Sequence, residues 1–389
     1  MRIALIATGD SASAGEGGLL AGRSLARHQL DFALALACEK VILFGHGASE
    51  EAIALRHAAE AGGAQVGVVR GVRDLPAAVR RDDLLLVLAH GLLPDSLSAF
   101  ERLKEGTAVL ILPAEAGWSA GFERLDLAAA WGGAMVLPGR LVAQLDQLPE
   151  DAEPIAGLLR IARQAGVPER PLAESELAEG RWQIVRGAEA ARAIEPAWLR
   201  RRLPPVPLFQ PTAWLARALV RRFGSRWAGS SRTGLALPAG AVLILIGAMA
   251  AAWFALPTLA FAVLVAAALI AEVNDAVGRL VRASFSTETK MSAISLTLRL
   301  MWDATLLACG VLTIDGSPAH RLFAPLVTIG LLQLARPILA GWRVLAEDRG
   351  VIAAFLALAA GLGFVEGGFM ALALLLIGLC LAAPEAQRG

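Results

Sequence analysis

The sequence is poor in charged residues and in cysteine. Asp, Glu, Lys and Arg make up 18% of the 389 residues, against about a quarter in soluble proteins, whereas 56% are hydrophobic. Part of the chain is therefore expected to face lipid. The net charge of +1 provides no basic field that would attract nucleic acid, so we expect no nucleic-acid partner. The three cysteines, Cys38, Cys309 and Cys380, lie too far apart for a disulfide framework or a zinc site.

The N-terminus lacks the long apolar stretch of a cleavable signal peptide. The run from Met1 to Gly9 is short and is typical of a first β-strand. We therefore expect a multi-pass protein of the inner (plasma) membrane whose N-terminal domain stays in the cytosol.

Up to about residue 165, short apolar segments alternate with segments of helical periodicity. The strand-like segments are Arg2–Ala7, Lys40–Phe44, Gln65–Val69, Asp83–Leu88 and Ala108–Leu112, and the helix-like ones include Ser24–Cys38 and Ser49–Ala61. This alternation predicts an α/β, Rossmann-like domain over residues 1–195, with a mainly parallel sheet covered by helices on both faces. Because such sheets bind ligands beyond the carboxyl ends of their strands, the Gly- and Ser-rich loop Thr8–Gly22 is the first candidate site.

Residues 196–233 combine arginine with tryptophan and aliphatic residues. Within them, Thr212–Trp227 predicts an amphipathic helix that lies on the inner membrane surface, held by apolar burial and by anionic lipid. The alternative is a solvated basic linker. We favour the membrane helix because long hydrophobic segments follow it directly.

Six apolar runs follow, and they predict a polytopic, all-α membrane bundle of about six helices over residues 234–384. The runs are Leu235–Phe254, Pro257–Val273, Ile294–Ile314, Leu322–Leu345, Val351–Phe364 and Phe369–Ala383. Because several are shorter than the ~20 residues of an upright span, the alternative is five spans, with one of the last two runs re-entrant. With six spans, the arginine-rich stretch before the bundle and the basic loops around Arg282 and Arg343 all lie on the cytosolic side, and only Arg321 does not fit.

Four segments of the N-terminal domain carry a family resemblance: Ala21–Ile42, Asp83–Asp95 (DLLLVLAHGLLPD), Gly121–Gly133 (GFERLDLAAAWGG) and Leu158–Ala162. They resemble the sugar-phosphate and related nucleotidyltransferases. The first is similar to the segment after that family's signature loop, the second to the strand that delivers a metal-binding Asp, and the last two to its substrate half. The resemblance covers roughly residues 1–185 and implies a domain that binds a nucleotide of CTP type.

The loop that would hold the triphosphate departs from the family pattern. In the family it is Gly-rich and carries an Arg and a following Pro-Lys, because backbone N–H groups and cations must hold phosphate. Here the loop keeps its glycines, and Gly15, Gly17 and Gly18 are the candidate binding residues. It also adds Asp10 and Glu16 and lacks the Pro-Lys.

The metal position of this domain departs as well. Where the family's Asp would hold Mg²⁺, the sequence has Ala89 followed by His90. His90 and Asp95 are the residual metal candidates, and a core or capping role is the favoured alternative for His90. Asp126 is left as a candidate carboxylate for ligand binding.

The basic amphipathic helix, the roughly six helices after it and a polar motif at the cytosolic end of the second helix are also a family pattern. In these features the membrane half resembles the CDP-alcohol phosphatidyltransferases, which exchange the CMP of a CDP-linked lipid or alcohol for another hydroxyl. Fusion to a nucleotidyltransferase-like domain is a known arrangement in inositol-phospholipid synthesis. The family motif runs Asp, two residues, Asp-Gly, two residues, Ala-Arg, eight residues, Gly, three residues, Asp, three residues, Asp. Its four carboxylates hold two divalent cations, and the last one also acts as a base.

Placed on this sequence without a gap, the motif keeps one glycine and its arginine but none of its carboxylates. The aligned residues are Asn274, Val277, Gly278, Val281, Arg282, Met291, Ser295 and Arg299. The resemblance therefore implies a binding site formed by Asn274, Gly278, Arg282 and Arg299 rather than a working two-metal centre. Mg²⁺ or Mn²⁺ is expected as a cofactor only if the protein is an active enzyme.

Two ionisable residues, Arg299 and Asp303, lie one turn apart inside the third predicted membrane helix. One interpretation is an i,i+4 ion pair that neutralises itself. The other is a guanidinium that replaces the metal ions and keeps a positive cavity for phosphate. Four further polar residues would line that cavity: Glu272, Asn274, Asp275 and Arg336. Asp275 and Asp303 are the candidate catalytic residues if a metal site persists.

Together these features predict a membrane protein of phospholipid head-group biosynthesis whose membrane half is catalytically degenerate. Such a protein would bind membrane lipid, a phospho-alcohol or a nucleotide of CDP or CTP type, or serve as a scaffold or regulator. The alternative is an active transferase with atypical site residues. A transporter-like bundle is a further alternative, although the sequence has no internal repeat of broken helices. Because the resembling family often pairs its bundles, a homodimer is also expected.

Overall fold

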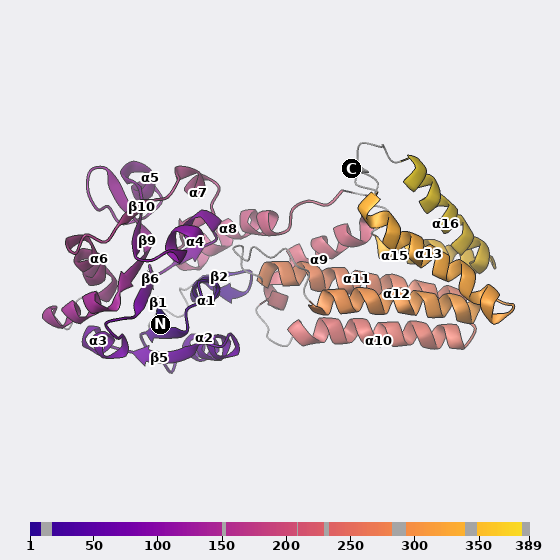
Figure 1. Cartoon of the computed structure of the whole chain (residues 1–389), viewed down its shortest axis with the longest axis horizontal. Helices are drawn as coiled ribbons and strands as arrows, with labels where there is room; N and C mark the ends of the chain where they lie inside the picture. The colour runs from indigo at the N-terminus through magenta and orange to yellow at the C-terminus, as the bar shows by residue number, and fades with distance from the viewer. Residues whose placement is uncertain are drawn as a thin grey trace. The chain divides into compact units, whose positions relative to one another are not determined.

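The structure, a computed structural model, describes residues 1–8, 18–149, 153–207, 209–228, 233–281, 293–338 and 348–382. The chain divides into two compact units. The first is Met1–Trp198, and the second comprises Leu199–Val281 and the described residues from 293 onward. An α/β unit is thus followed by a mostly helical one (Figure 1), as the sequence predicts at this coarse level.

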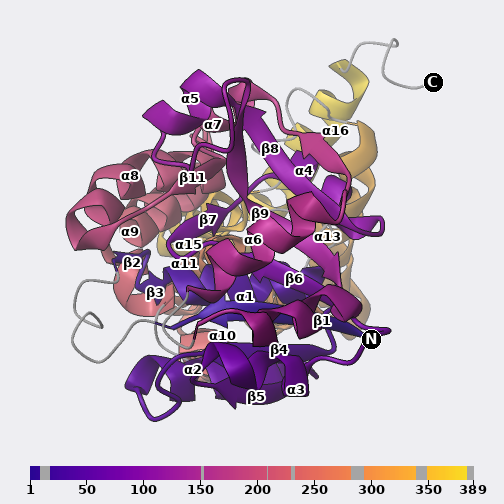
Figure 2. The ribbon, with the colours of Figure 1, turned by 90° about the vertical axis from the view of Figure 1, so that its left-hand side faces the viewer.

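The first unit is built on a seven-stranded sheet with the order β10-β8-β9-β6-β1-β4-β5. The strands are β1 (Arg2–Ala7), β4 (Lys40–Phe44), β5 (Gln65–Val69), β6 (Leu84–Leu88), β8 (Ala108–Pro113), β9 (Ala129–Pro138) and β10 (Glu169–Pro171). Figure 2 shows them in this order, from β5 at the bottom of the view to β8 near the top. β5, β4, β1 and β6 are parallel neighbours, in the order that begins a doubly wound fold.

The prediction of a mainly parallel sheet needs one correction. β9 runs antiparallel to both of its neighbours, β6 and β8, so the sheet is mixed. Gly132 and Gly133 lie inside β9, and glycine is depleted in strands, so the sequence does not mark this strand. β8 approaches the first of them closely, since a Cβ on Gly132 would lie 3.0 Å from the Cβ of Leu110, which would have to shift by a few tenths of an ångström.

Helices cover both faces of this sheet. They are α1 (Leu25–Ala35), α2 (Glu50–Ala61), α3 (Leu75–Ala78), α4 (Leu97–Lys104), α5 (Ala114–Ser119), α6 (Pro154–Gln164), α7 (Glu174–Ala178), α8 (Gly187–Arg202) and the 3-10 helices η1 (Val72–Asp74) and η2 (Gly139–Gln147). Because side chains alternate along a strand, Ile6, Val41 and Leu43 pack in one cluster with residues of α1 and α2. Leu5 and Ile42 belong instead to the larger cluster of the opposite face.

Two small ladders and three serine caps complete this unit. The ladders pair β2 (Leu19–Leu20) with β3 (Arg23–Ser24) and β7 (Leu92–Pro94) with β11 (Trp182–Ile184). Ser24, Ser49 and Ser96 each accept a hydrogen bond from the backbone N–H three residues later, at 3.3, 3.1 and 3.0 Å. These caps start α1, α2 and α4.

The second unit contains, in its described part, α9 (Pro211–Ala228), α10 (Thr233–Trp253), α11 (Pro257–Val281), α12 (Ala293–Thr313), α13 (Pro318–Ile338), α15 (Arg349–Gly361) and α16 (Val365–Ala382). α11 packs against α9, α10, α12 and α15, and α13 packs against α16. Figure 1 shows α10, α11 and α12 side by side. Polar side chains reach neighbouring backbones: Trp302 Nε1 donates to the carbonyl of Leu264 at 3.1 Å, and Thr328 Oγ1 to that of Phe369 at 3.1 Å.

Three of the described helices are long and apolar enough to cross a membrane: Gly234–Trp253, Pro257–Val281 and Ala293–Thr313. Two shorter apolar helices lie at Arg349–Gly361 and Val365–Leu379. These helices indicate a membrane protein, but the six predicted spans are not confirmed. The 13 residues of α15 rise by only about 20 Å, less than the ~30 Å of a bilayer's hydrocarbon core.

α9 is a helix over the segment in which the sequence predicts one. Its buried side is a narrow stripe of Ala216, Val220 and Gly224, which follow one another at the four-residue spacing of a single helix face. A Cβ on Gly224 would lie 3.2 Å from Leu280 of α11, so the two helices approach closely along this stripe.

Candidate functional site

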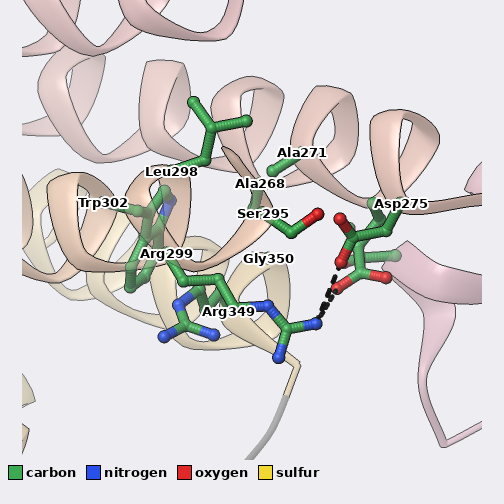
Figure 3. Close-up of a pocket in the computed structure, with 11 residues that line it drawn as sticks. Ala268, Ala271, Asp275, Ser295, Leu298, Arg299, Trp302, Arg349 and Gly350 are labelled. Atoms are coloured by element: carbon green, nitrogen blue, oxygen red, sulfur yellow. Dashed lines mark hydrogen bonds and ion pairs between the residues drawn. The ribbon is translucent and has the colours of Figure 1, made fainter. Parts of the chain in front are cut away.

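A small pocket lined by both charged and apolar side chains lies in the second unit, where α11 nears its end and where α12 and α15 begin (Figure 3). The residues that line it are Thr212, Ala268, Ala271, Glu272, Asp275, Ser295, Leu298, Arg299, Trp302, Arg349 and Gly350. They belong to α9, α11, α12 and α15. The free space inside barely reaches what a single water molecule needs, so a larger ligand enters only if the surrounding side chains move.

Arg299 joins α12 to two carboxylates of α11. Its Nη2 donates to Oδ2 of Asp275 at 3.1 Å and lies 4.0 Å from Oε1 of Glu272. Asp275 and Glu272 share one face of α11 because they are three residues apart. The side chain of Asp275 is 11% exposed and that of Arg299 is 29% exposed. In Figure 3 the guanidinium of Arg299 extends toward the carboxylate of Asp275.

Arg349 forms a second ion pair, with Asp303 of α12. Its Nε and Nη2 donate to the two carboxylate oxygens of Asp303 at 3.0 and 2.9 Å, which is the bidentate geometry that arginine favours. The guanidinium carbon lies 5.6 Å from the ring centroid of Trp302. Gln333 also donates to Asp303, at 2.8 Å. The pair is largely buried, with the two side chains 13% and 14% exposed.

The two ionisable residues of α12 therefore form ion pairs with different helices. The i,i+4 pair that their spacing suggests is replaced by Arg299 with Asp275 and by Asp303 with Arg349. The second expectation, a positive cavity, also differs from the structure. The lining includes two acidic and two basic side chains, Glu272 and Asp275 against Arg299 and Arg349, so its charges balance.

Asp348 links α9 to α15 and is a site residue that the sequence analysis missed. It is 5% exposed. Its Oδ1 caps α15 by accepting hydrogen bonds from the N–H groups of Gly350 and Val351 at 3.0 and 3.2 Å. Its Oδ2 accepts one from the N–H of Thr212 in α9 at 3.0 Å. The signal was present, since an acidic residue directly before an apolar helical run is a typical N-cap.

The other predicted binding residues of this unit are not brought to the pocket. Asn274 and Gly278 lie on α11 but are not among the lining residues. Asn274 is next to Asp275 in sequence, and consecutive helical residues point about 100° apart, so the two face different sides. Arg282 lies outside the described residues, and so does the side chain of Arg336.

Of the three candidate glycines in the phosphate loop, only Gly18 lies among the described residues, and it is needed for packing. A Cβ on Gly18 would lie 2.4 Å from the Cβ of Ala191 and 2.7 Å from the carbonyl oxygen of Gly187, both in α8. The requirement for glycine at this position is therefore explained by the approach of α8. Gly15 and Gly17 lie outside the described residues.

Asp126 holds a turn together. Its Oδ1 accepts hydrogen bonds from the backbone N–H groups of Ala128 and Ala129, both at 2.9 Å. Its Oδ2 pairs with Nη2 of Arg163, also at 2.9 Å. The backbone donors first, and the guanidinium after them, hold the pKa of this carboxyl below its usual value. One oxygen is thus engaged within the turn between α5 and β9, and the other is engaged by Arg163 of α6.

The metal candidates of the first unit lie apart from any ligand cluster. His90 is exposed just beyond β6, which excludes a core role and leaves the capping role as a prediction, and Asp95 is buried with 6% exposure. Among the described residues, no group of three or more His, Cys, Asp and Glu side chains could hold a metal ion. The pocket does not fit the family's two-metal centre either, because the guanidinium of Arg299 lies where a cation would contact Asp275.

The sequence matches no protein-family model and no curated protein. The two family resemblances are therefore carried by the sequence motifs alone.

Proposed function

We propose that the protein works in phospholipid head-group biosynthesis at the inner membrane, with its α/β unit in the cytosol. Its membrane half is a phosphatidyltransferase-like bundle that acts by binding rather than by two-metal catalysis. Its ligands are a nucleotide of CDP or CTP type, a phospho-alcohol or an anionic lipid. Through them it regulates or scaffolds an active enzyme of the same pathway, and like the resembling family it pairs as a homodimer.

One observation carries this proposal: the ion pair of Arg299 with Asp275. A two-metal transferase needs carboxylates that are free to hold divalent cations. Here Asp275 is 3.1 Å from a guanidinium, and that guanidinium belongs to the position at which the family motif has its last carboxylate. A guanidinium supplies positive charge and hydrogen bonds, but it cannot coordinate and activate a hydroxyl as a metal ion does.

The test is a turnover assay on the full chain in detergent. The protein is given CTP, Mg²⁺ or Mn²⁺, a panel of phospho-alcohols and CDP-diacylglycerol, and the release of CMP and of pyrophosphate is measured separately. We expect no CMP release. Metal-dependent CMP release that is lost in Asp275→Asn, but kept in the exposed control Asp315→Asn, would overturn the proposal in favour of an active transferase.

A binding measurement accompanies this assay. Thermal stabilisation by CDP-diacylglycerol without CMP release is the expected result, and Arg299→Met should reduce it. Pyrophosphate release from CTP and a phospho-alcohol would assign an activity to the α/β unit and leave the proposal for the membrane half intact. A chain that neither turns over nor is stabilised by any of these ligands would contradict the binding role.

A further inference from the structure

α9 has two faces with different surroundings. Its small-residue stripe is buried, whereas Trp214, Leu215 and Phe223 are 48%, 42% and 37% exposed. At 100° per residue, Trp214 and Leu215 lie on the side of α9 away from this stripe, together with Arg222, whereas Phe223 lies at the border of the stripe. Exposed large apolar side chains next to cationic ones are typical of helices that lie in a membrane interface. The opposite faces of α9 therefore fit two partners at once: the bundle on one side and a lipid surface on the other.

The charge of α9 selects the kind of lipid. The helix contains four arginines and no acidic residue. Two of them also hold the preceding chain, since Arg217 donates to the carbonyl of Pro204 and Arg221 donates to that of Leu203 at 2.9 Å. Arg222 lies beside the exposed apolar residues, with its guanidinium carbon 5.8 Å from the ring centroid of Phe223. A helix whose charged residues are all arginines is complementary to anionic phospholipid head groups.

The first turn of α9 is also part of the pocket. Thr212 and Gly350 both line it. They are packed so closely that a Cβ on Gly350 would lie 2.0 Å from Oγ1 of Thr212. Asp348 binds the N–H of Thr212 with one oxygen and caps α15 with the other. Any movement of the first turn of α9 away from the bundle therefore breaks a bond to the residue that fixes the start of α15, which carries Arg349.

We propose that α9 is an anionic-lipid-binding helix whose occupancy holds the pocket wall in place through Asp348. Lipid binds the face that carries Trp214, Leu215 and Arg222, while the small-residue stripe stays on α11. Because both contacts need the same helix position, lipid binding stabilises the docked α9. That state in turn strengthens the bonds of Asp348 to Thr212 and to the first turn of α15. By reciprocity, whatever binds in the pocket and requires α9 in place increases the affinity for anionic lipid. The inference does not depend on whether the membrane half is catalytic.

The experiment compares the full chain in nanodiscs of phosphatidylcholine alone and of phosphatidylcholine mixed with phosphatidylglycerol. The readout is hydrogen exchange at three backbone amides that donate to Asp348: Thr212, Gly350 and Val351. We expect all three to exchange about tenfold more slowly in the anionic discs, the effect of one to two arginines at an anionic surface.

Two variants test the lipid-binding face, and one serves as a matched control. Trp214→Ser and Arg222→Gln change exposed side chains of α9 and should abolish most of the difference between the two lipids at all three amides. Trp253→Ser changes a tryptophan that is 74% exposed at the end of α10, and it should leave the difference unchanged. Arg222→Gln alters charge with little change in shape, so it stays informative if Trp214→Ser folds poorly.

Two outcomes would overturn the proposal. If no amide distinguishes the two lipid compositions, α9 is not an anionic-lipid surface. If Thr212 responds but Gly350 and Val351 do not, lipid binds α9 without acting on the pocket wall.

Discussion

Replacing Arg349 with methionine should destabilise the helical unit by about 3 kcal/mol. Removing one partner of a buried ion pair costs about 3–5 kcal/mol, because the remaining charge is left without compensation. The lower end applies here, since the pair is 13% and 14% exposed and Gln333 still donates to Asp303 at 2.8 Å in the variant. For a unit of this size the loss corresponds to about 6–12 °C in the unfolding midpoint.

The assay is thermal unfolding in detergent, followed by tryptophan fluorescence. Trp302 is a suitable reporter because its ring lies under the guanidinium of Arg349. The double variant Asp303→Leu/Arg349→Met removes both charges and should recover most of the loss, since replacing both members of a buried pair by apolar groups is often neutral. Arg279→Met is the control, because Arg279 is exposed on α11.

Two results would contradict this prediction. In the first, Arg349→Met would unfold at the same temperature as Arg279→Met. In the second, the double variant would be no more stable than Arg349→Met alone. The first result would mean that the bidentate pair contributes nothing measurable. The second would mean that the loss comes from the packing of the arginine side chain rather than from an uncompensated Asp303.

Three further outcomes are expected. Burial raises the pKa of Cys38 to about 12, so at pH 8 only about one thiol in ten thousand is ionised, and N-ethylmaleimide should label Cys38 only after unfolding, as peptide mass spectrometry would show. Asp126→Asn should lower the unfolding temperature at pH 7. The difference in unfolding temperature between Asp126→Asn and the unchanged chain should vanish as the pH falls through the lowered pKa of the folded chain, below the ordinary value of about 3.9. At such a pH, Asp126 is protonated in the folded and in the unfolded chain alike. Gly350→Ala should cost about 1–3 kcal/mol by pushing against Thr212, and Thr212→Ala in the same chain should restore part of the unfolding midpoint.

Local signals in the sequence predicted much of the first unit. Ser24 and Ser49 start two helices because their hydroxyls satisfy free N–H groups, and that chemistry depends only on neighbouring residues. β9 could not be found in this way. Its glycines argue against a strand locally, and the strand forms because it pairs with β6 on one side and β8 on the other. The antiparallel direction is a tertiary property that no spacing in the sequence encodes.

Some residues of the site were predictable from the sequence, among them Glu272, Asp275 and Arg299, but their partners were not. Periodicity places Arg299 and Asp303 on one helix and suggests that they pair with each other. The structure pairs Asp303 with Arg349, 46 residues later in the chain, and only the packing of α15 against the bundle brings them together. Both Asn274 and Asp275 were expected to line the cavity, but they are consecutive on a helix, and the rotation of α11 presents only Asp275 to the pocket.

The pairing of Asp303 with Arg349 also sets an order for biogenesis. The chain is synthesised from its N-terminus, so Asp303 leaves the ribosome 46 residues before its partner does. An ionised residue within a membrane helix costs about 2.5–3.5 kcal/mol at insertion. α12 therefore enters the bilayer carrying a charge that a later segment neutralises. A chain truncated before α15 would leave the carboxylate of Asp303 without this arginine, so the charge balance of α12 depends on a helix that is synthesised later.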